Sequence, residues 1–245
     1  MGCSEVGPVP TRPGRPGRPR ALSEDEILDA ALELLDEGGT AAASVRGIAA
    51  RVGVAPNAVY TYFPDKAAIQ AAIVERLLGS VDHGFFTESE HSWRQRVEAL
   101  AQEVRLRLSA HPGAIPLLIG GPMDGPHALA LNERLLEVLT QAGLNATNAA
   151  RAAHLLTAYV VGSIALEVAD VDHPGPLPPE EERVATRQRA LTASPTQFPR
   201  TAAAAPTIAG YVATDQYLWG LRRLLDGITT RTAAPLSDQE QTGAC

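Results

Sequence analysis

Cysteine is nearly absent from this chain of 245 residues, in which only Cys3 and Cys245 occur, one near each end. Two cysteines so far apart cannot build the disulfide framework of a small secreted domain, nor a zinc site that needs four ligands. The chain begins with arginines but without the apolar stretch of a signal peptide. Together these features favour a reducing, cytoplasmic environment.

Aromatic residues and long apolar runs are also scarce. Aromatic side chains make up 4% of the chain, which disfavours an RNA-binding surface of rings stacked on bases. The most apolar stretch, residues 152–166, lies between Arg151 and Glu167. It is shorter than the roughly 20 residues that a membrane-spanning helix needs. We therefore expect a buried helix there and no membrane partner.

Positive charge is in deficit, with 21 Lys plus Arg against 28 Asp plus Glu and a net charge of −7, and Lys66 is the single lysine. Over the whole chain this balance argues against nucleic acid as a partner. Its distribution argues the other way, because residues 1–22 carry +3 and residues 38–66 carry +2, whereas residues 23–37 carry −7 and residues 67–245 carry −5. The two positive segments are therefore the candidates for a surface that faces DNA.

The composition, rich in alanine and poor in aromatics, predicts an all-α fold. Residues 1–22 form an Arg- and Pro-rich tail and residues 229–245 a polar tail, both without regular structure. We expect a helix-turn-helix domain over residues 23–66. A helical domain follows over residues 67–228, in which residues 172–208 are loops apart from one short helix near 180–193. The strongest helical segments of this second domain are residues 124–143, 146–171 and 213–228.

The first helix has a clear start and a clear end. Ser23 and Glu26 have the spacing of a capping box, and Asp25 adds negative charge at the positive end of the helix dipole. Gly38 and Gly39 end the helix. Between them runs one apolar stripe, which consists of Ile27, Ala31, Leu34 and Leu35.

Residues 44–66, SVRGIAARVGVAPNAVYTYFPDK, have the pattern of a helix-turn-helix. Ala49 is the small residue where two helices cross, Gly53 accepts positive φ in the turn, and Pro56 suits the first turn of the second helix. The exposed side chains expected there are small or hydrogen-bonding, include no carboxylate, and suit a DNA major groove. They are Asn57, Ala58, Thr61 and Tyr62, with Tyr60 beside them. The alternative is a helical hairpin that merely packs.

This segment resembles the DNA-binding domain of the tetracycline-repressor (TetR) family over about residues 22–80. The hallmark is the run Gly53-Val54-Ala55, Val59-Tyr60, Tyr62-Phe63 and Lys66. The resemblance implies a homodimeric regulator, usually a repressor, on a palindromic operator. It also implies roles for individual residues: Arg46 reads a base, Tyr60 and Lys66 hold phosphates, and Ser44 helps through its hydroxyl. The Arg-rich tail is either a minor-groove arm or a solvated tail with general attraction to phosphates.

Residues 93–228 resemble, less strongly, the ligand-binding domain of the same family. The resemblance implies that the helices over 146–171 and 213–228 pair with their copies in a dimer, and that a cavity holds a small-molecule effector. In tetracycline repressors a histidine helps to hold the metal carried by the drug, and Leu117 takes its place here. We therefore expect another apolar or amphipathic effector. Candidate cavity residues are Phe86, Trp93, Leu117, Met123, His127, Asn132, His154 and Tyr159, with Phe85 as a further candidate.

Signals for catalysis or cofactors are poor. The sequence has no G-x-S-x-G, H-E-x-x-H, P-loop or G-x-G-x-x-G motif, so we expect no enzyme, no catalytic residue, no cofactor and no metal. Asp170, Asp172 and His173 cluster at a helix end, where a solvated terminus is more common than a metal site. The alternatives that remain are a helical small-molecule-binding protein without a DNA role, and an activator of the same fold.

Overall fold

A computed structural model describes residues 22–84, 91–169 and 175–230 of the chain. All regular elements in these ranges are helices, which confirms the all-α prediction. The elements are α1 (Glu24–Ala42), α2 (Val45–Val52), α3 (Pro56–Val59), α4 (Lys66–Gly79), α6 (Trp93–Ser109), η1 (Pro112–Ala114), α7 (Ile115–Gly120), α8 (Pro126–Gln141), α9 (Ala146–Ala169), α10 (Glu180–Leu191), α11 (Pro199–Ala209), η2 (Gly210–Val212) and α12 (Thr214–Thr230).

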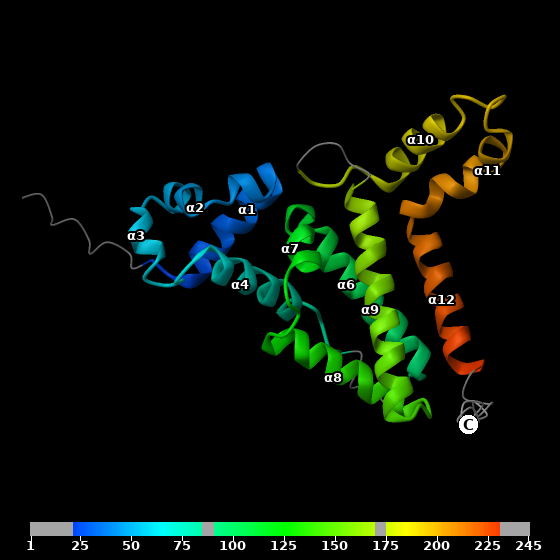
Figure 1. The fold of residues 1–245 in the computed structure, drawn as a ribbon, viewed down its shortest axis with the longest axis horizontal. Coiled ribbons are helices and arrows are strands. Elements are labelled where there is room, and N and C mark those ends of the chain that lie inside the picture. Colours follow the sequence, from blue (N-terminus) through cyan, green and yellow to red (C-terminus); the bar gives the residue numbers. More distant parts are fainter. Residues whose placement is uncertain (1–21, 85–90, 170–174, 231–245) are drawn as a thin grey trace, which may run out of the picture.

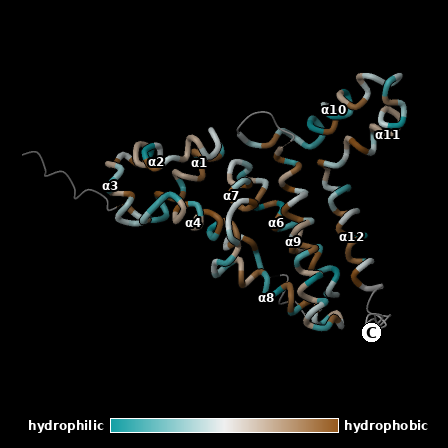
Figure 2. Tube along the Cα trace, in the orientation of Figure 1, coloured by the Kyte–Doolittle hydropathy of each residue, from teal (hydrophilic) through white to brown (hydrophobic). Residues whose placement is uncertain are grey.

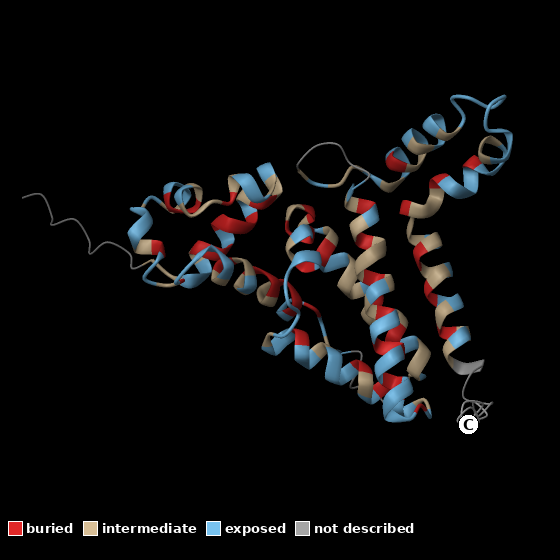
Figure 3. Ribbon diagram, viewed as in Figure 1, coloured by how far each residue is buried: buried red, intermediate tan, exposed pale blue. Residues whose placement is uncertain are grey.

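The helices form two groups and a projection. Helices α1–α4, here called the N-terminal bundle, lie at one end of the molecule, and α6–α9 with α12, the C-terminal bundle, form the centre and the other side (Figure 1). Helices α10 and α11 project from the C-terminal bundle as an arm and are mostly exposed (Figure 3). One core of buried residues continues through both bundles, from Ile27 in α1 to Leu225 in α12.

Helix α1 begins as the sequence predicts. The Ser23 hydroxyl accepts from the Glu26 amide at 3.2 Å, and the Glu26 carboxylate accepts from the Ser23 amide at 3.0 Å, so the capping box is present. The predicted end is confirmed as a break, because Gly38 and Gly39 leave helical geometry and Gly39 takes a φ of 65°. One further helical turn follows the break and brings the chain to Ala42.

The arm corrects the prediction for residues 172–208. Its first helix, α10, was expected, but α11 falls in a span predicted to be loop. Pro206 inside α11 is the reason for the error, since an interior proline usually breaks a helix. Here Pro199 occupies the first turn, where its missing N–H costs nothing, and alanines with high helix propensity precede Pro206. Hydrophilic residues dominate α10 (Figure 2).

Helix α9 is longer than the apolar stretch that the sequence suggested. Its 24 residues are long and apolar enough, by length and composition alone, to cross a membrane. It packs instead against α6, α7, α8 and α12, and Ala152, Leu156, Val160 and Ile164 lie in the core. Such packing is typical of the central helix of a helical bundle.

Candidate DNA interface and ligand cavity

The turn of the helix-turn-helix is held by local contacts. The Ser44 hydroxyl accepts from the Gly47 amide at 3.1 Å and caps α2. Gly53 follows α2 with φ 75° and ψ 31°, the left-handed conformation that glycine adopts without strain. A bond of 2.9 Å from the Val54 amide to the Ala49 carbonyl closes the turn. The predicted roles of Gly53 in the turn and of Ala49 as a buried small residue are confirmed.

Helix α3 is short and is held to the core by one buried side chain. Pro56 occupies its first turn, and Val59 is fully buried. On its outer side Asn57 and Thr61 are exposed, and the Thr61 hydroxyl donates to the Asn57 carbonyl at 3.4 Å. Tyr60 is half exposed and Ala58 is half-buried. These four residues form the outer face of α3 and of the turn after it.

Tyr62 does not lie where the sequence suggested. It is half-buried against the core, and its hydroxyl donates a hydrogen bond to the Leu22 carbonyl, just before α1. Tyr62, like Ala58, is therefore less exposed than the sequence suggested, and its contact with DNA stays a prediction. The hydrogen bond from Tyr62 to Leu22 links the residue before α1 to the turn after α3.

Two exposed positive side chains lie on the helices before and after α3. Arg46, in the first turn of α2, is exposed, and within the described residues no ion pair or hydrogen bond holds its guanidinium. Lys66 begins α4 and is also exposed, and its ammonium donates to the Thr40 carbonyl at 3.1 Å. Both cations can therefore meet an anion outside the protein.

Several carboxylates of α1 form exposed ion pairs with arginines of neighbouring helices. Arg51 of α2 bonds Glu33 at 2.9 Å and also bonds Glu37. The hydrogen bond to Arg51 holds the pKa of Glu37 below its usual range, and the same bond raises the pKa of Arg51. Arg76 of α4 bonds Asp29 at 2.6 Å and Asp25 at 3.3 Å in the same way. Four of the seven carboxylates in residues 23–37 are thus paired with two arginines of the neighbouring helices.

A partly open cavity of about 990 Å³ is lined by the C-terminal bundle and by Leu78 of α4. This volume is at the upper end of the range typical of small-molecule sites. Three of the predicted residues line it, namely Met123, Asn132 and His154. Thr157 is the other polar contributor, and no Asp, Glu, Lys or Arg is among the residues that line it. The wall is otherwise apolar and includes residues that were not predicted: Val97, Leu100, Val104 and Leu108 of α6, Leu118 and Ile119 of α7, and Leu131 and Leu135 of α8.

Four other predicted cavity residues lie elsewhere. Leu117 points into a small gap lined by α1 and α4, and His127 bonds Glu75. The Tyr159 ring stacks on Tyr217, and its hydroxyl donates to the Tyr217 carbonyl at 2.8 Å. Trp93 packs at the start of α6 beside its neighbour, the Arg94 guanidinium. Phe86, like Phe85, lies outside the described residues.

The predicted dimer face on α9 and α12 is partly corrected. Leu156, Val160, Tyr217 and Leu225 are buried in the core of their own chain. Leu155 and Ala158, which belong to the predicted face, are exposed. Leu166 and Trp219 are also exposed on these two helices and were not predicted.

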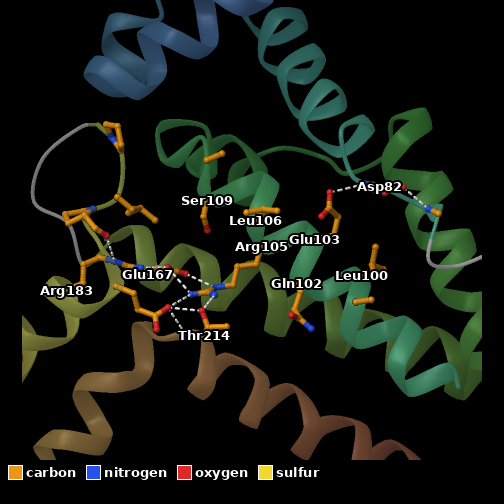
Figure 4. A pocket seen from close by; sticks show the side chains of 17 residues that line it. Asp82, Leu100, Gln102, Glu103, Arg105, Leu106, Ser109, Glu167, Arg183 and Thr214 are labelled. Carbon is orange, nitrogen blue, oxygen red and sulfur yellow. Dashed lines mark hydrogen bonds and ion pairs between the residues drawn. The ribbon is translucent and has the colours of Figure 1, made fainter. Parts of the chain in front are cut away.

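A second pocket, of about 980 Å³, lies at the base of the arm and holds a cluster of charges (Figure 4). Glu167 of α9 is 5% exposed and accepts from Arg105 of α6 at 3.0 and 3.1 Å. Arg183 of α10 bonds the same carboxylate at 2.8 Å. Glu180 accepts from the Thr214 amide at 3.0 Å, which joins the start of α12 to the cluster. No sequence signal pointed to these residues, because they are far apart in the chain.

Metal and cofactor sites were not predicted, and within the described residues no group of three or more His, Cys, Asp or Glu side chains is arranged to hold a metal ion. The cluster of Asp170, Asp172 and His173 lies outside the described residues, as do the Arg-rich tail and both cysteines.

The fold and these sites define a helix-turn-helix protein with an attached helical domain that carries an apolar cavity. More particularly, the chain belongs to the tetR family of bacterial regulatory proteins. Residues 27–73 match the family described as "Bacterial regulatory proteins, tetR family", and residues 87–232 match the "Tetracyclin repressor-like, C-terminal domain".

Individual relatives agree with this assignment. An HTH-type transcriptional regulator of Saccharopolyspora erythraea is 32% identical over 146 residues, which are 60% of this chain and 61% of that protein. The HTH-type transcriptional repressor DrrR1 of Streptomyces coeruleorubidus is 27% identical over 62% of this chain and 56% of its own length. The chain therefore spans less than two thirds of these curated relatives.

Solved structures share the fold over more of the chain. A possible TetR family transcriptional regulator from Streptomyces coelicolor A3(2) has a TM-score of 0.74 at 29% identity and covers 85% of this chain and 100% of its own. The Streptomyces coelicolor protein ActR, in complex with actinorhodin, has a TM-score of 0.71 at 20% identity, with 87% and 99% covered. At that identity the likeness shows the fold alone.

Proposed function

We propose that this chain is a homodimeric, cytoplasmic transcriptional repressor, released from a palindromic operator by an uncharged apolar or amphipathic effector. The observation that carries the proposal is the outer face of α3, which has hydrogen-bonding side chains and no carboxylate, together with the exposed Arg46 on the preceding helix, whose guanidinium no other described residue holds. An α-helix bearing such side chains fits a major groove, and an arginine fork can grip guanine.

The domain division supports the same function. We assign DNA binding to residues 23–66, and ligand binding and dimerisation to residues 67–228. Helix α4 joins them, since it packs on α1 within the N-terminal bundle and on α7 and α8 of the C-terminal bundle. The tails, 1–22 and 229–245, lie outside this division, and a minor-groove role for the arginines of the first tail stays a prediction.

Dimerisation follows from the need for two recognition helices. A single helix-turn-helix contacts one half-site, whereas a dimer contacts two successive major grooves on one side of the duplex. Leu155, Leu166 and Trp219 leave apolar surface on α9 and α12 exposed. We assign this surface, with Ala158, to the contact with a second copy; Leu166 and Ala158 also line the cavity, so the second copy would lie against its rim.

The effector class follows from the cavity wall. Because no Asp, Glu, Lys or Arg lines it, a charged ligand would lose its hydration without gaining an ion pair. Asn132, His154 and Thr157 supply the polar contacts that orient a ligand. An uncharged, largely apolar molecule that offers a few hydrogen-bonding groups fits this wall. Binding releases DNA only if the effector prefers the conformation with low DNA affinity.

Selection of bound duplexes from a random pool tests the proposal. We expect a palindrome to be enriched, and Arg46→Ala to relax the preference at one base pair in each half-site. Arg134→Ala, on the exposed face of α8, is the matched control and leaves the selected sequence unchanged. If the folded protein enriches no sequence and retains no DNA at low salt, it is a small-molecule-binding protein without a DNA role. A reporter fused to the selected site distinguishes repression from activation.

A further inference from the structure

Two carboxylates of the N-terminal bundle bond the starts of two elements in the C-terminal bundle. The first is Asp36, near the end of α1. Its two oxygens face the His111 imidazole Nδ1 at 2.9 Å and the Gly113 amide at 3.1 Å, at the start of η1. The two backbones are also very close here, since a Cβ on Gly113 would lie 2.0 Å from the Leu35 carbonyl oxygen. Helix α1 and η1 therefore cannot slide past each other without breaking this contact.

The second carboxylate is Glu75 of α4. It accepts from the His127 amide at 2.7 Å and from the Ala128 amide at 3.3 Å, and His127 Nδ1 lies 3.1 Å from it. These amides belong to the first turn of α8, whose N-cap residue, Gly125, has no side chain to satisfy them. A carboxylate at this position also favours the positive end of the helix dipole.

Both elements lead directly to the cavity. η1 continues into α7, which contributes Leu118 and Ile119 to the wall. Helix α8 contributes Ala128, the residue whose amide bonds Glu75, together with Leu131 and Leu135. If a bound molecule displaces α7 or α8, the displacement therefore reaches α1 through Asp36 or α4 through Glu75.

We propose that Asp36 and Glu75 are positioning residues that couple the cavity walls α7 and α8 to the orientation of the DNA-binding helices. This inference rests on the function proposed above. Four other carboxylates of α1 bond arginines within the N-terminal bundle instead: Glu33 and Glu37 bond Arg51, and Asp25 and Asp29 bond Arg76. Charge-assisted bonds to backbone amides are short and strong, so moving one of the bonded helices without the other would break them.

Hydrogen exchange with DNA as the probe tests the coupling without an effector. Because coupling between two sites is reciprocal, DNA bound at α3 must change the opening of α7 and α8. The measurement compares amide exchange of the full chain with and without the palindromic duplex obtained by selection. In the wild type we expect slower exchange in α7 and α8 when DNA is bound. In Asp36→Ala/Glu75→Ala we expect DNA still to slow exchange in α1–α4 while the change in α7 and α8 disappears.

Two further variants separate positioning from general damage. Gly125→Ala keeps the charge of Glu75 but displaces its carboxylate, since the new Cβ would lie 2.2 Å from the Glu75 carboxyl carbon. This variant should weaken the effect of DNA on amide exchange in α8 and leave the effect in α7 unchanged. Asp29→Ala removes an α1 carboxylate that bonds Arg76 and should leave both changes intact. If the double variant fails to fold, the same exchange measurement is made on Gly125→Ala and Asp36→Asn instead.

The outcomes distinguish this inference from the proposed function. If DNA binds but α7 and α8 respond equally in the wild type and in the carboxylate variants, apolar packing carries the coupling and the inference is overturned. If DNA binds and neither helix responds in the wild type, the inference is overturned as well. If no duplex binds, the proposed function fails and the inference fails with it.

Discussion

The N-terminal bundle and the C-terminal bundle differ in how far apart in the sequence their functional residues lie. The candidate DNA interface comes from 23 consecutive residues, 44–66, in which cap, turn and helix follow one another. The cavity draws on α6, α7, α8 and α9, on Leu78 of α4 and on Leu221 of α12, so its residues span more than half of the chain. A local motif can be recognised from spacing, whereas a cavity is made by packing between distant segments.

The two bundles also use charge differently. In the N-terminal bundle the ion pairs are exposed: Arg51 and Arg76 each have side chains 33% exposed. Pairs of this kind contribute little to stability, about 0–1 kcal/mol each. In the C-terminal bundle the buried carboxylate of Glu167 pairs with Arg105 and Arg183 and so joins α9 to α6 and to the arm.

The largest expected effect is in the C-terminal bundle. Glu167→Ala removes the carboxylate that pairs with the buried Arg183 and leaves Arg105 only the more distant Glu180, at 3.9 Å. Removal of one partner of a buried pair costs about 3–5 kcal/mol. We expect the free energy of unfolding to fall by this amount in urea denaturation. Glu137→Ala, which removes an exposed carboxylate that pairs with Arg134, should change it by less than about 1 kcal/mol. Equal effects would show that the buried cluster is not structural.

A smaller effect on a different quantity is expected at the DNA interface. Arg46→Ala should weaken binding by about 1–3 kcal/mol at each half-site while leaving the unfolding curve unchanged, because Arg46 is exposed. Fluorescence anisotropy with the selected duplex and with one substituted base pair measures it. A loss of stability without a loss of base preference would assign Arg46 to the fold.

Replacing a glycine with alanine should lower the stability of the protein in the N-terminal bundle and raise it in the C-terminal bundle. Gly53→Ala places a side chain at φ 75° and should destabilise the protein by about 1–2 kcal/mol. Gly227→Ala lies inside α12, where the new Cβ meets nothing within 4 Å, and should stabilise it by about 0.5–1 kcal/mol. Thermal unfolding of both variants checks the pair. A stabilising Gly53→Ala would mean that the turn does not have the left-handed geometry.

The smallest expected effect is that of Lys66→Ala. Without its ammonium, one phosphate in each half-site is no longer neutralised, so binding to all sequences should weaken alike. The slope of log affinity against log salt should become shallower by about 1 for each such phosphate. Anisotropy titrations of the variant at several salt concentrations measure this slope. A change in sequence preference would contradict the phosphate role of Lys66.

The N-terminal bundle could be predicted from the sequence in detail because each signal is local. Ser23, Ser44, Gly53 and Pro56 all occupy the positions that their chemistry requires. Tyr62 is the exception, since its place depends on Leu22, 40 residues earlier. In the C-terminal bundle, the helices α8, α9 and α12 were predictable from their apolar patterns.

The cavity residues were predicted poorly, because spacing does not say which face of a helix looks inward. His127 and Tyr159 were chosen for their chemistry, yet both are bonded to other residues. The apolar face of α6 that carries Val97, Val104 and Leu108 has helical spacing and was the signal that could have been used. The cluster around Glu167 has no local signal, since Arg105 is 62 residues away from it.

The salt dependence of binding to the selected duplex tests the central claim most directly. Fluorescence anisotropy titrations of the folded full chain at a series of salt concentrations measure the affinity of the outer face of α3 for DNA. We predict saturable binding of one dimer per palindrome, with log affinity falling linearly as log salt rises. Absence of binding at low salt, or an affinity that does not change with salt and is unaffected by Arg46→Ala and Lys66→Ala, would contradict the account.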